Sequence, residues 1–292
     1  MVRLMDVPAK NQAAGQVTDD EHARRAASFG AAARAYAEHR PDYPPTAIRW
    51  ALAPAAGLGR HPVRILDLGA GTGKLTAQLA GLALDGGKAD VVAVEPDPHM
   101  LAELRSGLRQ RSLPTVTAVL GNAENIPLPD ESVDVVIAGQ AAHWFDLDRA
   151  MPEIFRVLTP GGVFAGLWNA DDDRVGWVAG LHRASGRRNV MARTSFFHDD
   201  DGISAWLRDA GRGLFSPPEG CGFGHAQLRT ADSLIATMRT HSMFLIMEPA
   251  EREAVLSSVR DYLAATPQTA SGEFSLPIWT ITLRSVKLRG PG

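Results

Sequence analysis

The side chains most suited to chemistry gather in one short stretch, where an acidic residue precedes three glycines. Asp67 stands two residues before Gly69, and Gly71 and Gly73 follow at alternate positions. Glycine adopts positive φ at little cost and has no Cβ, so a ligand can approach such a turn closely. A carboxylate beside the turn repels a pyrophosphate at short range. The stretch therefore predicts a site for a cationic or zwitterionic ligand.

The spacing of the glycines differs from the dinucleotide fingerprint G-x-G-x-x-G/A, whose third position would fall on Lys74. A second acid, Glu95, ends the next apolar segment of the chain. A carboxylate at that place can accept hydrogen bonds from both hydroxyls of a ribose. A ribose without a pyrophosphate, together with a positively charged group, suggests S-adenosylmethionine.

The elements that position these residues alternate between apolar, β-branched segments and segments with helical spacing. This alternation predicts an α/β fold with a mostly parallel, doubly wound sheet. Residues 273–287 alternate apolar and polar side chains, as an antiparallel last strand does. We expect strands at residues 63–68, 90–95, 115–120, 132–138, 163–168, 223–229 and 273–287, and helices at 22–36, 74–84, 98–111, 147–158, 233–247 and 249–265.

The order and spacing of Asp67, the glycine turn and Glu95 resemble those of the class I S-adenosylmethionine-dependent methyltransferases. Residues 139–145, Gly-Gln-Ala-Ala-His-Trp-Phe, match the subgroup that includes ubiquinone-pathway and trans-aconitate-type methyltransferases. The Tyr-x-x-x-Arg-Pro-x-Tyr-Pro segment of residues 36–44 also recurs in that subgroup. The resemblance is specific over residues 36–169. It implies a Rossmann-like, seven-stranded sheet with helical cover from the N-terminus and from the segment after strand five.

The resemblance also implies which residues bind the cofactor. Asn122, where the family more often has Asp, would accept from the adenine amino group, and the Ala123 backbone would meet the ring. A loop turn stabilised by the Asn122 side chain is the alternative. Arg40 or Tyr36 would lie near the methionine carboxylate, unless Arg40 is an ordinary surface residue. The implied set is Tyr36, Arg40, Asp67, Gly69, Ala70, Gly71, Thr72, Gly73, Glu95, Pro96, Met100, Asn122, Ala123, Glu124, Gln140 and Ala141.

On the acceptor side, the resemblance implies Tyr43, His143, Trp144, Trp168 and Asn169. His143 is the candidate catalytic residue, because an imidazole with a pKa near 6.5 can act as a general base toward a hydroxyl. Its alternative role is to bond the backbone and fix the loop. A carboxylate acceptor needs no base at all.

Composition restricts the other ligand classes. The net charge of −3 gives no general attraction to nucleic acid or to anionic membranes. Residues 171–173, residues 198–201, and His241 near Glu248 are acidic or histidine-containing but lack metal-ligand spacing, so we expect no metal. The single cysteine, Cys221, excludes an internal disulfide and fits a reducing compartment.

We expect residues 1–21 to form a disordered leader, 22–170 the cofactor-binding core with its N-terminal cover, 171–222 an acceptor-side insertion, and 223–292 the C-terminal part of the core. We see no secretory signal pattern and expect a cytoplasmic enzyme. The predicted reaction is methyl transfer to a small, partly apolar molecule, with O-methylation favoured. A protein of the same fold that guides a rearrangement without methyl transfer, or one that only binds ligand, is the alternative. The oligomeric state stays open.

Overall fold

The computed structural model describes residues 41–84, 87–113, 115–186, 209, 211–239, 244 and 246–288. Tyr36, Arg40, the expected leader and the expected helix of residues 22–36 lie outside the described residues. The acidic segment 198–201 and His241 lie outside them as well. What the sequence predicts for these parts of the chain stays a prediction.

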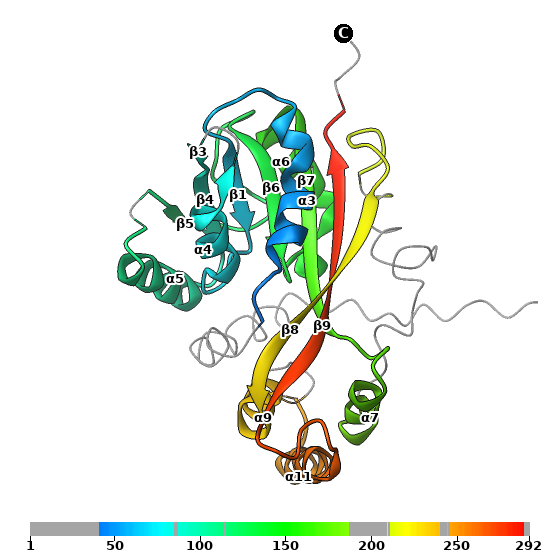
Figure 1. The fold of residues 1–292 in the computed structure, drawn as a ribbon. Coiled ribbons are helices and arrows are strands. Elements are labelled where there is room, and N and C mark those ends of the chain that lie inside the picture. Colours follow the sequence, from blue (N-terminus) through cyan, green and yellow to red (C-terminus); the bar gives the residue numbers. More distant parts are fainter. Residues whose placement is uncertain are drawn as a thin grey trace, which may run out of the picture.

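Seven strands form one sheet, which confirms the predicted fold class. The first five strands across the sheet run parallel. β9 lies between β7 and β8 and is antiparallel to both, as the alternating residues 273–287 predict. The order is β5 (Thr117–Leu120), β4 (Asp90–Glu95), β1 (Arg64–Leu68), β6 (Val133–Gly139), β7 (Leu158–Asp171), β9 (Glu273–Val286) and β8 (Glu219–Thr230) (Figure 1).

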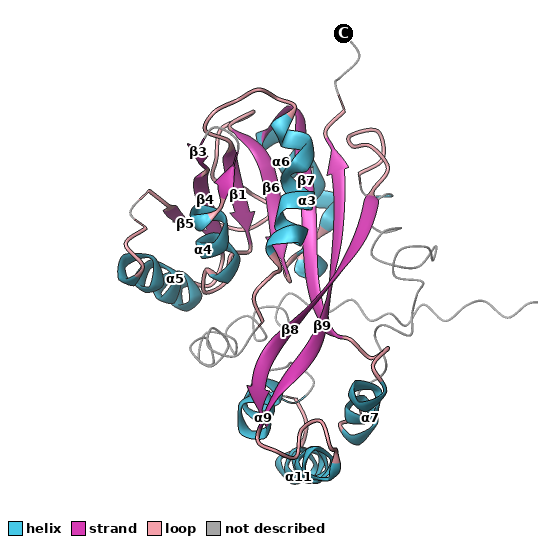
Figure 2. Cartoon of the chain, in the orientation of Figure 1, coloured by secondary structure: helices cyan, strands magenta, loops and turns pink. Residues whose placement is uncertain are grey.

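Helices cover both faces of the parallel part of the sheet, which gives three layers (Figure 2). Helices α3 (Pro45–Ala56), α4 (Lys74–Gly81) and α5 (Pro98–Gln110) pack on one face. Helix α6 (Leu147–Val157) packs on the other through Ala150, Met151 and Ile154. Since both faces are covered, residues 65–68 of β1 are all buried, and all but Asp67 are apolar.

Several segments differ from the expected elements. The helix expected at residues 233–247 is α9 (Ala231–Arg239), and Ile246 and Met247 form a bend outside it. Helix α4 ends at Gly81 rather than at residue 84, because β2 (Ala83–Leu84) pairs with β3 (Gly87–Lys88) in a small hairpin sheet. β7 runs from Leu158 to Asp171 and begins directly after α6, whereas the expected strand covers only residues 163–168. Gly161 adopts φ +78°, and the pairing with β6 shifts register near Val133, so the strand accommodates the Pro-Gly-Gly stretch.

The long strands β8 and β9 extend beyond the core sheet and carry a second group of helices at their far end (Figure 1). Helices α7 (Gly176–Ala184), α9 (Ala231–Arg239) and α11 (Pro249–Ala265) share a separate apolar core with Phe274 and Leu276 of β9. This core joins residues from both sides of the predicted boundary at 222. The division of the chain into segments stays a prediction.

The sheet also decides where a ligand can bind. β1 pairs with β4 on one side and with β6 on the other, so the chain reverses its winding direction at β1. In open α/β sheets, the carboxyl ends of the strands at such a point form a crevice. Asp67 and Glu95 both lie at that edge.

Candidate active site

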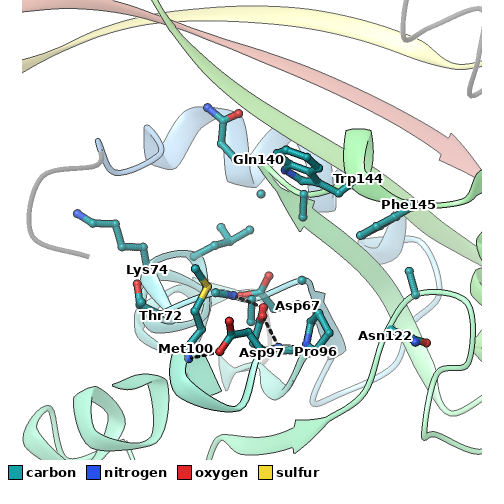
Figure 3. Close-up of a pocket in the computed structure, with 18 of the residues that line it drawn as sticks. Asp67, Thr72, Lys74, Pro96, Asp97, Met100, Asn122, Gln140, Trp144 and Phe145 are labelled. Carbon is teal, nitrogen blue, oxygen red and sulfur yellow. Dashed lines mark hydrogen bonds between the residues drawn. The ribbon is translucent and has the colours of Figure 1, made fainter. Parts of the chain in front are cut away.

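A cavity of about 500 Å³ opens at the carboxyl ends of β1, β4 and β6 (Figure 3). Gln140 and Trp144 lie across it from Asp97 and Met100. Its lining is formed by Pro41, Tyr43, Asp67, Gly69, Ala70, Gly71, Thr72, Lys74, Leu75, Glu95, Pro96, Asp97, Met100, Asn122, Ala123, Glu124, Gly139, Gln140, Ala141, Trp144, Phe145 and Asn169.

The glycine turn has the backbone shape that its composition predicts. Gly69 adopts φ +72°, and a Cβ there would stand 2.7 Å from the Cβ of Ala141. Gly71 adopts φ +58°, and no protein atom within the described residues lies within 4 Å of the place of its Cβ. Gly69 is therefore required by packing between two loops, whereas Gly71 leaves open space beside the cavity.

Asp67 lies at the floor of the cavity and is only 1% exposed. Its Oδ2 accepts a hydrogen bond of 2.5 Å from the Thr76 hydroxyl, while its Oδ1 has no partner among the described residues. Burial raises the pKa of Asp67 from 3.8 to about 7, against the opposing effect of the Thr76 bond. A buried carboxyl with one oxygen unsatisfied is a site for a hydrogen-bond donor or a cation.

Glu95 is buried at the end of β4 and holds the glycine turn. Its Oε2 accepts from the Gly71 amide at 2.7 Å, and its Oε1 accepts from the Asp97 amide at 2.9 Å. Burial raises the pKa of Glu95, and the two amide bonds act in the opposite direction. A carboxylate has about four lone-pair sites, so each oxygen can still accept a further hydrogen bond.

Negative groups outnumber positive groups in the lining. The acids are Asp67, Glu95, Asp97 and Glu124, whereas Lys74 is the single lysine or arginine among the lining residues. The Lys74 ammonium is itself paired with Asp42, at 3.1 Å. The cavity therefore favours a cationic or zwitterionic ligand, as Asp67 alone predicted.

The loop after β6 brings backbone and small side chains to the cavity. A Cβ at Gly139, the last residue of β6, would stand 2.7 Å from the Tyr43 hydroxyl, so a larger residue would force Tyr43 to shift. Gln140 adopts φ +55°, which is costly for a side chain of this type and is held by two bonds. The Gln140 backbone N–H donates to the Leu167 carbonyl, and its side-chain Nε2 donates to the Asn169 backbone carbonyl, both at 2.8 Å.

Residues 41–44 precede α3 without regular secondary structure and contribute Pro41 and Tyr43 to the lining; we call this segment the strap. The Tyr43 amide donates to Gln78 Oε1 at 3.1 Å, and Gln78 Nε2 donates back to the Tyr43 carbonyl at 2.7 Å. The Asn169 side chain donates to the carbonyls of Pro41 and Asp42, at 3.3 Å and 3.1 Å. Tyr43 is thereby buried against the site.

His143 lies in a 3₁₀ turn after β6, but it is exposed and does not line the cavity. The Trp168 indole donates to His143 Nδ1 at 3.2 Å. A neutral His143 that accepts at Nδ1 carries its proton on Nε2, so it donates rather than accepts at that atom. The predicted role of His143 as a base stays a prediction.

The cavity brings together most of the residues that the sequence singled out. Gly73, His143 and Trp168 do not line it, and Gly73 instead caps helix α4. Six lining residues were absent from the expected set. They are Pro41, Lys74, Leu75, Asp97, Gly139 and Phe145, and all but Leu75 adjoin predicted residues in the chain.

Within the described residues, no group of three or more His, Cys, Asp or Glu side chains could hold a metal ion. His182 approaches Asp171 at 3.2 Å and Asp173 at 3.8 Å but forms no such group. In the same part of the chain, every helix is too short or too polar to cross a membrane.

Known proteins resemble this chain over the same core. Residues 66–166 match the protein family described as a methyltransferase domain. An uncharacterized methyltransferase of Mycobacterium tuberculosis is 41% identical over 260 residues, which cover 88% of this chain and 95% of the relative. A ubiquinone/menaquinone biosynthesis C-methyltransferase of Shewanella oneidensis is 39% identical over 105 residues, 35% of this chain and 41% of the relative.

A solved structure from Anaeromyxobacter dehalogenans, described as a type II methyltransferase, has a TM-score of 0.58 at 26% sequence identity. The similarity covers 86% of this chain and 99% of that chain. The similar sequences, the similar fold and the acidic glycine turn all indicate the same family. The chain belongs to the class I S-adenosylmethionine-dependent methyltransferases.

Proposed function

We propose that this cavity binds S-adenosylmethionine and that the enzyme transfers its methyl group to an oxygen of a small, partly apolar acceptor. The observation that carries the proposal is the buried Asp67, whose Oδ1 has no partner among the described residues. The ammonium of a methionine group satisfies such an oxygen. The open space at Gly71 and the acidic lining support the same ligand.

The other lining residues fit the remaining parts of the cofactor. Glu95 has lone pairs left for the ribose hydroxyls. Asn122 and the Ala123 backbone are assigned to the adenine, and Gln140 to the methionine part. Tyr36 and Arg40 stay predicted contacts of the methionine carboxylate, since they lie outside the described residues.

When bound, S-adenosylmethionine supplies an electrophilic methyl group on its sulfonium. The protein has to hold the acceptor atom in line with the S–CH3 bond and to exclude water. Tyr43, Trp144 and Phe145 give the cavity aromatic walls, which suit an acceptor with an apolar part. The strap closes part of the same cavity through Pro41 and Tyr43.

We favour a carboxyl oxygen as the acceptor atom over a hydroxyl. A hydroxyl needs a base to remove its proton, whereas a carboxylate is already ionised at neutral pH. The bond from Trp168 to His143 Nδ1 favours a proton on Nε2, which makes His143 a poor base in this arrangement. His143 then serves to fix the loop, the alternative that the sequence left open.

The first test is titration calorimetry with S-adenosylmethionine, S-adenosylhomocysteine and NAD. We expect the first two to bind wild-type protein, and NAD to give no heat of binding. Asp67→Ala should abolish binding while circular dichroism shows an unchanged fold. Absence of binding to folded wild-type protein would contradict the cofactor assignment.

The second test follows methyl transfer. Wild-type protein with S-adenosylmethionine should form S-adenosylhomocysteine only when an acceptor is added, and a panel of aliphatic and aromatic carboxylic acids is the first choice. Acceptor conversion without S-adenosylhomocysteine would instead indicate a rearrangement. Mass spectrometry and alkaline hydrolysis of the product identify a methyl ester.

Carbon methylation is the second candidate reaction. The relative from Shewanella oneidensis, which is similar to this chain over 105 residues, is named as a C-methyltransferase. A product that keeps its added methyl group after alkaline hydrolysis, with a new C–CH3 signal in its NMR spectrum, would support carbon as the acceptor atom.

A further inference from the structure

A row of polar side chains crosses three neighbouring strands beside the cavity. Asn169 of β7 pairs in register with Thr280 of β9. The Thr280 hydroxyl donates to Asn169 Oδ1 at 2.6 Å and lies 3.0 Å from Nε2 of His225 on β8. Thr280 is fully buried and does not line the cavity, and its hydroxyl reaches the lining through Asn169.

The chemistry of the groups fixes the direction of these bonds. Thr280 has one hydroxyl proton, which it donates to Asn169, so it accepts from the Nε2–H of His225. Asn169 uses its oxygen toward Thr280, so its NH2 group faces the strap. That NH2 group donates to the carbonyls of Pro41 and Asp42.

The orientation of the Asn169 amide matters because its two ends are nearly equal in shape but opposite in polarity. If the Asn169 side-chain amide rotated by half a turn, its oxygen would face the two strap carbonyls. Three hydrogen-bond acceptors would then lie together with no donor between them. The Thr280 hydroxyl supports the observed orientation, since it donates to the Asn169 oxygen. Removing that hydroxyl leaves the half-buried Asn169 oxygen without its donor and takes away the hydrogen bond that anchors the Asn169 side chain to β9.

The other bonds of the strap differ in strength. The ion pair between Lys74 and Asp42 is exposed on the Asp42 side, with that side chain 68% exposed, and such pairs contribute little. Gln78 holds Tyr43 by two bonds on the side of helix α4. On the side of the sheet, Asn169 donates hydrogen bonds to the carbonyls of Pro41 and Asp42.

We propose that Thr280 is a positioning residue, which orients the Asn169 amide and so holds the strap over the cavity. Its effect on cofactor affinity rests on the proposed function, whereas its effect on the strap does not. The strap supplies Pro41 and Tyr43 to the lining, so loosening it reduces the fraction of molecules with a complete site.

The same strand offers a matched control. Thr282 is also fully buried and stands two residues further along β9, but its hydroxyl has no partner among the described residues. Thr282→Val and Thr280→Val make the same chemical change in the same strand. Only Thr280→Val removes a hydrogen bond that reaches the strap.

The experiment measures hydrogen exchange of the Tyr43 amide, which donates to Gln78 in the strap, by NMR without ligand. We expect exchange in Thr280→Val to be roughly tenfold faster than in wild type. Thr282→Val and Thr280→Ser should stay within about twofold. Equal rates in all four proteins, or equal acceleration in both valine variants, would overturn the proposal.

Calorimetry with S-adenosylhomocysteine separates this inference from the proposed function. We expect its Kd to rise roughly tenfold in Thr280→Val, with Thr280→Ser restoring it. If wild-type protein binds no S-adenosylhomocysteine, the proposed function fails, and the exchange rates alone still decide the role of Thr280. If Thr280→Val does not fold, Asn169→Asp replaces the donor toward the strap, and unchanged Tyr43 exchange there overturns the proposal.

Discussion

Replacing Asp67 with asparagine tests the electrostatics of the site, because the change removes a buried charge and nearly preserves the side-chain volume. Burial raises the pKa of Asp67 from 3.8 to about 7. The folded protein therefore holds a proton on this group up to about pH 7, whereas the unfolded chain releases it near pH 4. Between these values the folded state binds more protons, so the free energy of unfolding falls as the pH rises.

The size of the effect follows from the two pKa values. Each pH unit between them costs about 1.4 kcal/mol of stability, so the whole window costs about 4 kcal/mol. Asparagine does not ionise and can still accept from Thr76, but its NH2 group meets the place where Oδ1 has no partner. That unsatisfied donor costs about 1–3 kcal/mol at every pH.

We therefore expect Asp67→Asn and wild type to have similar stability at pH 5, and the variant to be more stable by roughly 2 kcal/mol at pH 8. Urea unfolding followed by circular dichroism measures both proteins between these pH values. Asp232→Asn is the control, because that side chain is 87% exposed and its change should not depend on pH. A stability difference between wild type and Asp67→Asn that stays constant from pH 5 to pH 8 would refute the reasoning.

Three further changes test separate parts of the site. Gly71→Ala should lower stability by only about 1–2 kcal/mol, the cost of positive φ, because no described atom lies near its Cβ, but it should weaken S-adenosylhomocysteine binding at least tenfold in calorimetry. Glu95→Gln should raise the same Kd roughly tenfold or more, because its NH2 group would face one of two backbone donors; wild-type affinity would exclude Glu95 from the ribose site. His143→Ala should leave kcat within about threefold with a carboxylate acceptor, whereas a loss of 100-fold or more would restore His143 as the base.

Much of the site follows from local sequence. Asp67, Glu95 and Gln140 each stand at or just after the end of an apolar segment, and parallel strands bring such ends to one edge. Apart from Leu75, the lining residues that were absent from the expected set adjoin predicted residues. Gly139 and Phe145 lie within the motif of residues 139–145 that carries the resemblance, and Pro41 lies within that of residues 36–44, whereas the type of Leu75 carries no signal of its own.

The sequence by itself determined the alternation of core strands and helices and the acidic glycine turn, because these depend on residues close together in the chain. Tertiary structure decided that His143 meets Trp168 outside the cavity and that Asn169, 111 residues from Thr280, holds the strap. It also gathered α7, α9 and α11 into a separate core at the end of β8 and β9. Such contacts depend on strand register and on the conformations of individual side chains, which neither composition nor periodicity encodes.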